Sequence, residues 1–359
     1  MVDYATTFDR VRGSLVGGAI GDALGWPIEF LKWGQIQGRY GEQGVTGFLP
    51  QHNAGAPQEI TDDTQMTLFT AEGLLRAAAG ADPVPAMRRA YLRWLQTQRE
   101  EGPAAHTDGW LASLPFLYAS RAPGNACMSG LARQSRGYVA PEPFGENGPV
   151  NPHSKGCGTV MRSAPFGLAG MGPDQAFHTA ARAAQLTHGH PTGYLAAGAF
   201  AAILDRVVSG TALPIAVRET IAQLDGVPTT AETVAALAKA VTMAEEPPTA
   251  EQVEQVGAGW IAEECLAIAV YCALQAAKSG DVRAGLLLSV NHSGDSDSTG
   301  SVAGNLIGAV HGISALPMDW ASTVEGRDVL IQVADDLVMN FGLGDRSGLD
   351  ARFPLDAGL

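Results

Sequence analysis

Apolar residues in this chain recur mainly at helical spacing. Ala- and Leu-rich segments place apolar side chains three and four residues apart, and Gly- and Pro-rich connectors separate these segments. Alternating β-branched runs, which would indicate strands, are scarce. We therefore predict an all-α fold, with loops concentrated in the Gly-, Pro- and Asn-rich stretch 99–157. The expected helices cover about 7–25, 62–79, 84–98, 158–170, 174–188, 192–208, 213–224, 230–243, 258–278, 281–289, 298–313 and 326–341.

Two of these predicted helices carry a glycine at every fourth position. The two series are Gly13, Gly17, Gly21 and Gly25, and Gly300, Gly304, Gly308 and Gly312. Because glycine costs about 1 kcal/mol relative to alanine inside a helix, each series indicates a need for close backbone approach. If the two ridges pack antiparallel on each other, Glu29 comes near Asp295 and Asp297. The spacing alone also allows each ridge to pack on some other helix.

Two acidic sequences lie far apart in the chain, TDDT at 61–64 and DSDST at 295–299, each where a helix is expected to begin. Ser, Thr and Asp cap helix N-termini, so either cluster alone is explained as a cap. Together they supply carboxylate and hydroxyl oxygens with no nearby His or Cys cluster, which suits Mg²⁺, Mn²⁺ or Ca²⁺ better than zinc. An EF-hand loop starting at Asp295 fails, because its twelfth position is Leu306 where a glutamate is required. We predict one oxygen-ligated metal site.

Composition narrows the function further. The 359 residues are 46% hydrophobic, and their length would permit two domains, but one shared metal site favours a single domain over 1–359, with its core at about 8–340. The formal net charge is −14 and no dense basic run is present, so we expect no nucleic-acid partner. With no signal peptide and no run able to span a bilayer, we expect a cytoplasmic protein without a membrane partner.

Five motifs then occur in a recognisable order. They are GSLVGGAIGDALG at 13–25 followed by Glu29, TDDTQM at 61–66, KGCGTVMR at 155–162, LTHGHP at 186–191, and GDSDSTG at 294–300. This ordered set resembles the ADP-ribosylglycohydrolase family, which includes ADP-ribosylarginine hydrolases and dinitrogenase reductase-activating glycohydrolases. Each motif alone would be weak, but all five at family-like spacing, from about 8 to about 340, are specific.

The resemblance implies a compact orthogonal helical bundle with two divalent cations, Mg²⁺ or Mn²⁺, at the floor of a cleft. The metal ligands that it implies are Thr61, Asp62, Asp63, Asp295, Asp297 and Ser298. Among these, Asp62 and Asp297 are also expected to be catalytic. A pair of cations can orient ribose hydroxyls and activate a water for attack at the anomeric carbon. Glu29 could serve as a base or as a movable gate over the metals.

A glycine-rich segment is the expected binding site for the substrate's pyrophosphate. It consists of Gly156, Cys157, Gly158 and Thr159, where a helix is expected to begin. Glycines there would let backbone N–H groups approach an anion at the positive helix end. A plain Gly-rich turn is the alternative. Arg162, shortly afterwards, is either a surface charge or one partner of a buried ion pair.

Two further roles come from the resemblance. It places His188 at the rim of the cleft near the distal ribose, whereas without it a capping or core histidine would be expected. It also calls for an acid beside the leaving guanidinium, and Asp108 occupies roughly the corresponding loop. Glu100 or Glu101 could take that part instead.

The function expected from these features is metal-dependent removal of ADP-ribose from protein side chains, most of all arginine, which reverses modification by an ADP-ribosyltransferase. Within the enzyme class, serine, nucleic-acid or small-molecule linkages are the alternative. A protein that binds and blocks an ADP-ribosyltransferase toxin also fits, as does, less well, a metal phosphohydrolase whose product would be AMP.

Overall fold

The computed structural model describes residues 4–50 and 55–356 and confirms the predicted all-α fold. No β-strand occurs in these residues, and only two isolated bridges, Gln58 with Val324 and Gly156 with Ile261, join extended segments there. The α-helices are α1 (Tyr4–Gly25), α2 (Trp33–Tyr40), α3 (Asp62–Arg76), α4 (Val84–Thr97), α5 (Asn125–Gln134), α6 (Ala164–Leu168), α7 (Pro173–Ala184), α8 (Pro191–Val208), α9 (Leu213–Leu224), α10 (Ala231–Met243), α11 (Ala250–Val256), α12 (Ala262–Ser279), α13 (Val282–Val290), α14 (Ser296–His311), α15 (Met318–Ala321) and α16 (Arg327–Leu337). Short 3-10 helices are η1 (Trp26–Ile28), η2 (Leu111–Ser113), η3 (Pro115–Tyr118), η4 (Cys157–Thr159) and η5 (Ile313–Ala315), and η6 (Val338–Gly342) is a π-helix.

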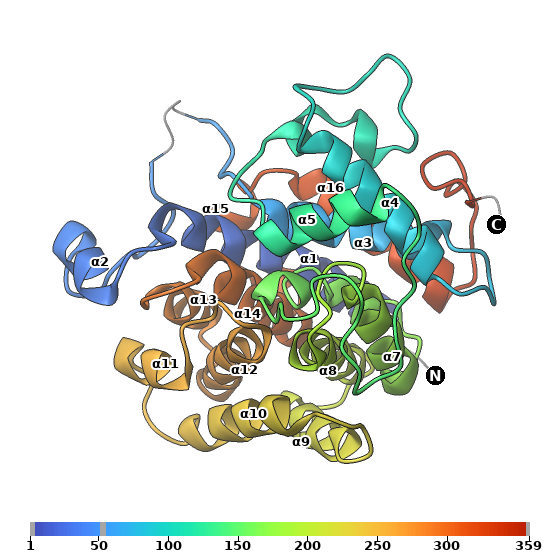
Figure 1. Cartoon of the computed structure of the whole chain (residues 1–359). Helices are drawn as coiled ribbons and strands as arrows, with labels where there is room; N and C mark the ends of the chain where they lie inside the picture. Colours follow the sequence, from blue (N-terminus) through green and yellow to red (C-terminus); the bar gives the residue numbers. More distant parts are fainter. Residues whose placement is uncertain (1–3, 51–54, 357–359) are drawn as a thin grey trace.

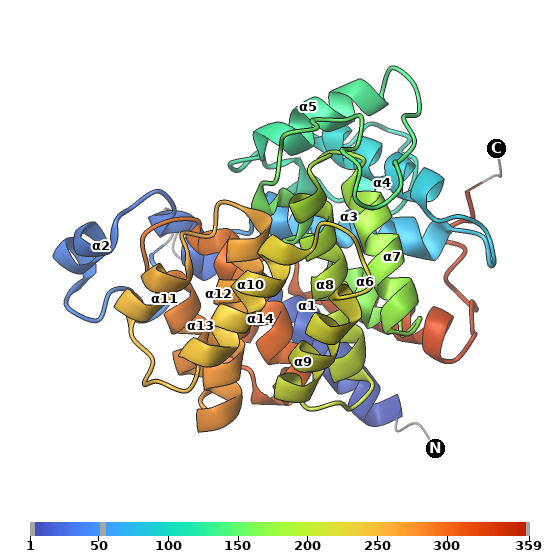
Figure 2. The same ribbon diagram turned by 60° about the horizontal axis from the view of Figure 1, so that its bottom comes forward.

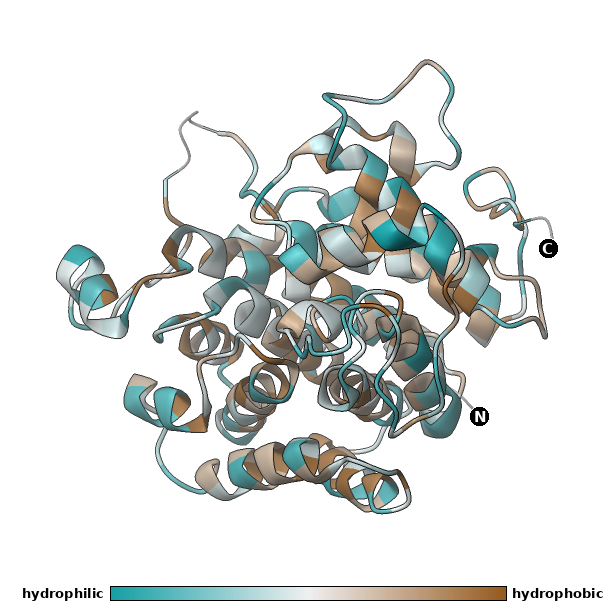
Figure 3. Cartoon of the chain, viewed as in Figure 1, coloured by the Kyte–Doolittle hydropathy of each residue, from teal (hydrophilic) through white to brown (hydrophobic). Residues whose placement is uncertain are grey.

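The expected helix over 158–170 is wrong in detail. It is two separate pieces, η4 and α6, because Pro165 lies in the first turn of α6 and a proline cannot continue a preceding helix. Four helices were not anticipated: α2, α5, α11 and α15. They are short, with four to ten residues each, and α2 is largely hydrophilic (Figure 3), so each offers few apolar positions from which a helical period can be inferred.

Helices α1 and α14 lie side by side at the centre of the molecule (Figures 1 and 2). Their glycine ridges face each other in antiparallel order, so that Gly17 meets Gly304 and Gly21 meets Gly300. A Cβ atom at Gly21 would overlap the carbonyl oxygen of Gly300, so even alanine cannot be accommodated without moving a helix. The sequence-based packing hypothesis is confirmed, and it carries Glu29 to the N-terminus of α14.

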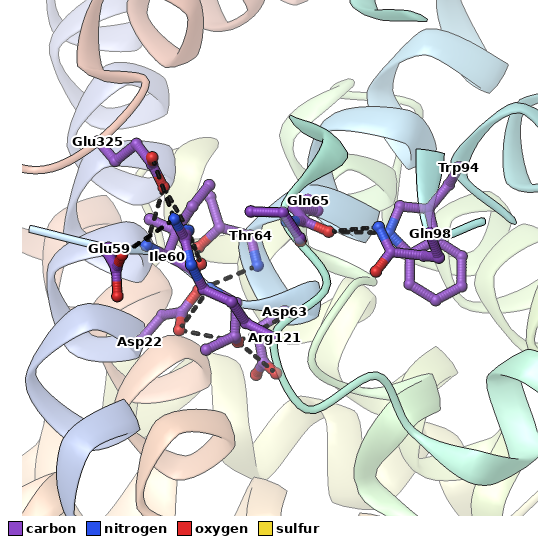
Figure 4. A network of polar contacts seen from close by, with 12 residues as sticks. Asp22, Glu59, Ile60, Asp63, Thr64, Gln65, Trp94, Gln98, Arg121 and Glu325 are labelled. Atoms are coloured by element: carbon purple, nitrogen blue, oxygen red, sulfur yellow. Dashed lines mark hydrogen bonds and ion pairs between the residues drawn. The ribbon is translucent and has the colours of Figure 1, made fainter. Parts of the chain in front are cut away.

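Asp22 fixes the start of α3 against α1. Its carboxylate accepts hydrogen bonds from the backbone N–H and hydroxyl of Thr61, at 3.0 and 2.9 Å, and from those of Thr64, at 3.2 and 2.6 Å. These contacts, part of the network in Figure 4, satisfy N-terminal donors of α3 from outside the helix. The first turn of α3, which carries Asp62 and Asp63, is therefore held at the same pocket as the start of α14.

The remaining helices enclose this centre. Helices α8, α12 and α13 pack on α14 or on each other, α7 packs on α8, and α9 and α10 form one edge (Figures 1 and 2). Almost every side chain of α8 and most of those of α12 are buried, so these two helices supply much of the core. Within 4–50 and 55–356, no helix is both long and apolar enough to cross a membrane.

Candidate active site

One pocket of about 490 Å³ brings the two acidic sequences together. It is formed by the N-termini of α3 and α14, the segment after η1, the loop before α5, and the segment around η4. The sequence-predicted residues that line it are Glu29, Asp62, Asp63, Gly156, Cys157, Gly158, His188, Asp295, Asp297 and Ser298. The separate motifs therefore build one site.

The carboxylates from the two ends of the chain meet at close range. Oxygens of Glu29, Asp295 and Asp297 lie within 4.8 Å of one another, the spacing of a group that could hold a metal ion. The backbone N–H of Ser298 donates to Asp297 Oδ1 at 2.9 Å, which fixes that side chain on the first turn of α14. On the facing side, the backbone N–H of Gly124 donates to Asp62 Oδ2 at 3.1 Å.

These acids are buried together without a basic partner. Burial raises the pKa of Asp62, Asp63 and Asp295 well above its ordinary range. Burial and the neighbouring carboxylates, Asp297 first among them, raise the pKa of Glu29 to about 10. No Lys or Arg among the described residues forms an ion pair with any of these groups. Their ionisation together calls for a cation.

Unpartnered oxygens show that these residues fit a hard cation. Glu29 Oε2 and Asp63 Oδ1 are both buried, and neither has a hydrogen-bond partner among the described residues. Buried carboxylate oxygens are normally paired, so an orphan pair beside other carboxylates suits an oxygen-seeking divalent ion.

The glycine-rich segment 156–158 lines the pocket but differs from the expectation. The thiol of Cys157 donates to Asp295 Oδ2 at 2.8 Å, and its backbone N–H donates to the carbonyl of Trp260 at 3.1 Å. Thr159 does not line the pocket, because its hydroxyl donates to the carbonyl of Gly193 at 2.7 Å inside the protein. Since η4 ends at Thr159, the long helix that should have offered its N-terminus to a pyrophosphate is absent there.

Two other predicted residues lie elsewhere. Thr61 does not line the pocket, because its hydroxyl is directed to Asp22 behind the first turn of α3. Asp108 is likewise outside the pocket: its carboxylate accepts from Arg76 at 2.9 Å and from Arg93 at 3.0 Å. The structure thus corrects the expected position of Asp108 beside the leaving group.

Residues that shape the site without having been predicted from the sequence include Asp22, Gly124, Phe30 and Trp260. Asp22 orients α3, and its signal was present, a lone acid within the Gly-rich apolar stretch of α1. Phe30 and Trp260 line the pocket and stack with ring centroids 5.2 Å apart, although 67% and 40% of their surfaces are exposed. Phe30 has a φ of +67°, a conformation that a bulky residue rarely adopts. No local sequence pattern predicts that these two aromatic side chains stack.

A larger hollow of about 750 Å³ lies beside α2, α12 and α13. It is mainly apolar and contains none of the residues of the carboxylate group Glu29, Asp295 and Asp297. The chemistry therefore belongs to the smaller pocket.

The fold and pocket define an all-α protein with a buried, oxygen-rich candidate metal centre at the meeting point of two central helices. A sequence model of the ADP-ribosylglycohydrolase family matches residues 3–346, and the chain belongs to that family.

Named relatives are similar over most of their length. The ADP-ribosyl-[dinitrogen reductase] glycohydrolase of Rhodospirillum rubrum is 25% identical, over 88% of this chain and 90% of its own. The ADP-ribosylarginine hydrolase Tri1 of Pseudomonas putida is 24% identical, over 92% of this chain and 78% of its own. A solved ADP-ribosylglycohydrolase-related protein complex superposes with a TM-score of 0.63 at 25% identity, covering 93% of this chain and 98% of that one.

Proposed function

We propose that this protein is a divalent-cation-dependent hydrolase that removes ADP-ribose from modified protein side chains, arginine above all. The observation that carries the proposal is the convergence of Glu29, Asp62, Asp63, Asp295 and Asp297 at one pocket without a basic partner. The ions that we propose are two Mg²⁺ or Mn²⁺, and the partner is an ADP-ribosylated protein.

The residues proposed to hold the cations are the four aspartates with Ser298, whose hydroxyl lies between the sulfurs of Cys157 and Met161 at 3.7 and 3.9 Å. When bound, a pair of such cations supplies charge stabilisation and a nucleophilic water for hydrolysis. Asp22 holds the first turn of α3 through Thr61 and Thr64, and the backbone N–H of Gly124 donates to Asp62. These contacts keep the aspartates of that turn in place as a ligand enters.

Glu29 is the group that we propose to move a proton. It is only partly exposed, stands at the end of η1 rather than inside a long helix, and reaches the carboxylates of α14. A carboxyl group placed beside the proposed cation ligands can pass a proton to a departing side chain.

Arginine is favoured because the named relatives include an ADP-ribosylarginine hydrolase. Asp108 does not account for a preference for arginine, since its carboxylate is paired with Arg76 and Arg93. The pocket offers a different receptor for a planar cation, the stacked Phe30 and Trp260 adjoining Glu29, because a guanidinium is attracted to aromatic faces.

The test incubates purified protein with arginine- and serine-ADP-ribosylated proteins, in Mg²⁺, in Mn²⁺ and in chelator, and follows free ADP-ribose by mass. Cation-dependent release from arginine alone is expected. Release from serine alone would replace the proposed linkage, and AMP as product would overturn the glycohydrolase assignment. The double variant Asp62→Ala with Asp297→Ala should release nothing; if it still protected a target from an ADP-ribosyltransferase, physical blocking would be the function instead.

A further inference from the structure

Arg162 is a buried cation that has no carboxylate partner. Its side chain is fully buried, and no described Asp or Glu forms an ion pair with it. Its guanidinium instead contacts Cys127 Sγ at 3.4 Å, lies 4.5 Å from the ring centre of Tyr91, and donates to Thr187 Oγ1 at 2.7 Å. A buried charge without a counter-charge destabilises a fold, so the groups that this guanidinium contacts bear on its role.

The hydroxyl of Thr187 links Arg162 to His188. It accepts from Arg162, and its single proton has two nearby acceptors, His188 Nδ1 at 2.7 Å and the carbonyl of Ala184 at 3.3 Å. That carbonyl already accepts the backbone N–H groups of Thr187 and His188, at 3.1 and 3.0 Å. The shorter contact therefore receives the proton, and a hydroxyl that accepts from a cation is the stronger donor.

A ring nitrogen that accepts a hydrogen bond carries no proton, so neutral His188 carries its proton on Nε2. This nitrogen faces the glycine segment of the pocket, because a Cβ atom at either Gly156 or Gly158 would lie 3.4 Å from it. No described residue is hydrogen-bonded to Nε2. The glycines leave room there for a ligand atom.

Arg162 also keeps the imidazole uncharged. Burial, and then the positive charge of Arg162, lower the pKa of His188 to about 3. Burial alone favours the neutral ring, and the charge of Arg162 adds to that preference. The ring is thereby held as a neutral donor.

We propose that Arg162 is a positioning residue which, through the Thr187 hydroxyl, holds His188 as its Nε2–H tautomer, so that the pocket wall presents a fixed neutral donor to an oxygen atom of the ligand. That the oxygen belongs to the ribose or diphosphate of ADP-ribose rests on the proposed function. The opposite tautomer would turn a lone pair toward the same oxygen and repel it.

The first test needs no substrate. The tautomer of His188 is read from long-range ¹H–¹⁵N correlations of the full-length, ¹⁵N-histidine-labelled protein in Mg²⁺ at neutral pH, with His188→Gln to assign the signal. A protonated Nε2 and unprotonated Nδ1 are expected. Thr187→Val, which removes the hydroxyl at nearly constant shape, should populate the Nδ1–H form, whereas Thr187→Ser should preserve the native pattern. A native Nδ1–H tautomer, or a tautomer that Thr187→Val leaves unchanged, would overturn the proposal.

The second test measures binding of free ADP-ribose by calorimetry. Loss of one directed hydrogen bond predicts affinity about 3- to 10-fold weaker in Thr187→Val and in Arg162→Met, with Thr187→Ser near wild type. Thermal unfolding is the check that each variant is folded. Methionine is chosen because it preserves much of the buried volume of Arg162. Unchanged affinity in folded Thr187→Val contradicts the role in binding. Because neither readout requires hydrolysis, a protein that releases ADP-ribose from neither arginine nor serine would refute the proposed function and leave this relay intact.

Discussion

The two ends of α3 bury acids in opposite ways. At its N-terminus, Asp62 and Asp63 have no basic partner among the described residues, and the acids near them make their ionisation harder. At its C-terminus, Glu72 is completely buried yet pairs with Arg93 at 3.1 Å and with Arg76, one turn later, at 3.5 Å. The same helix therefore carries an uncompensated cluster and a compensated one.

The compensated end continues into a network that joins distant parts of the chain. Arg76 also binds Asp108 and Asp356, both at 2.9 Å, and Arg89 binds Asp356 at 2.8 Å. Asp108 and Asp356 are each shared between two arginines, one on each carboxylate oxygen. Burial of an acid is common to both ends, so burial does not distinguish a functional carboxylate from a structural one. The missing counter-charge does.

The largest effect is expected from removing one charge at the uncompensated end. Asp297→Asn keeps the shape of the side chain but removes a proposed cation ligand, so cation-dependent release of ADP-ribose should fall on the order of 100-fold or more. Asp335→Asn, at the half-exposed pair with Arg12, is the matched control and should retain activity. Near-native activity of Asp297→Asn would remove the basis for the distinction.

The converse change breaks the compensated end. Glu72→Gln removes the central partner of Arg76 and Arg93, which keep their contacts with Asp108, so the free energy of unfolding should fall by about 1–3 kcal/mol. Urea denaturation measures this loss, and activity per folded molecule should be unchanged. A variant that is stable but inactive would mean that this end, too, serves the reaction.

Added cation should stabilise only through the uncompensated end. At about 100 times its dissociation constant, Mg²⁺ or Mn²⁺ should raise the free energy of unfolding by about 2.7 kcal/mol. Thermal unfolding with and without chelator gives the shift. It should vanish in Asp297→Asn and persist in Glu72→Gln, and a shift that survives in both would place the ion elsewhere.

Removal of cations should also make stability depend on pH. Folding raises the pKa of Asp22 from 3.8 to about 7 and that of Glu29 from 4.5 to about 10. An acid with a raised pKa binds more protons in the folded state than in the unfolded state. The stability that these two acids contribute is therefore fully present below about pH 4 and is lost as the pH rises toward their folded pKa values. Urea denaturation in chelator, from about pH 5 to about pH 8, should show the decline. Saturating cation should flatten this dependence of stability on pH. A stability that rises with pH in chelator would contradict the raised pKa values as its cause.

The smallest effect is expected at Asp108. Two-thirds of its side chain is exposed despite its contacts with Arg76 and Arg93, so Asp108→Asn should change the free energy of unfolding by about 1 kcal/mol or less. Hydrolysis of arginine-linked ADP-ribose should stay near the wild-type rate. A selective loss on that linkage alone would restore the sequence-based role of this residue.

The sequence predicted those features of the site that are encoded locally. Caps rich in Asp at two helix starts, and glycines at every fourth position, are readable patterns, and the packing of α1 on α14 joins them. Asp108 was misplaced because its direction depends on arginines from α3 and α4, which no local pattern reveals. Asp22 and Arg162 are single polar residues in apolar surroundings, and their partners are known only once the chain is folded.

The contact between α1 and α14 also sets an order on synthesis. Helix α1 ends at Gly25, whereas its partner begins at Ser296, so at about 5–20 residues per second roughly 10–60 s pass on the ribosome before the two can meet. Throughout that interval the bare glycine face of α1 has no permanent neighbour. A nascent chain that already contains Asp62 and Asp63 still lacks half of the pocket. The complete set of proposed cation ligands is present only once α14 has emerged.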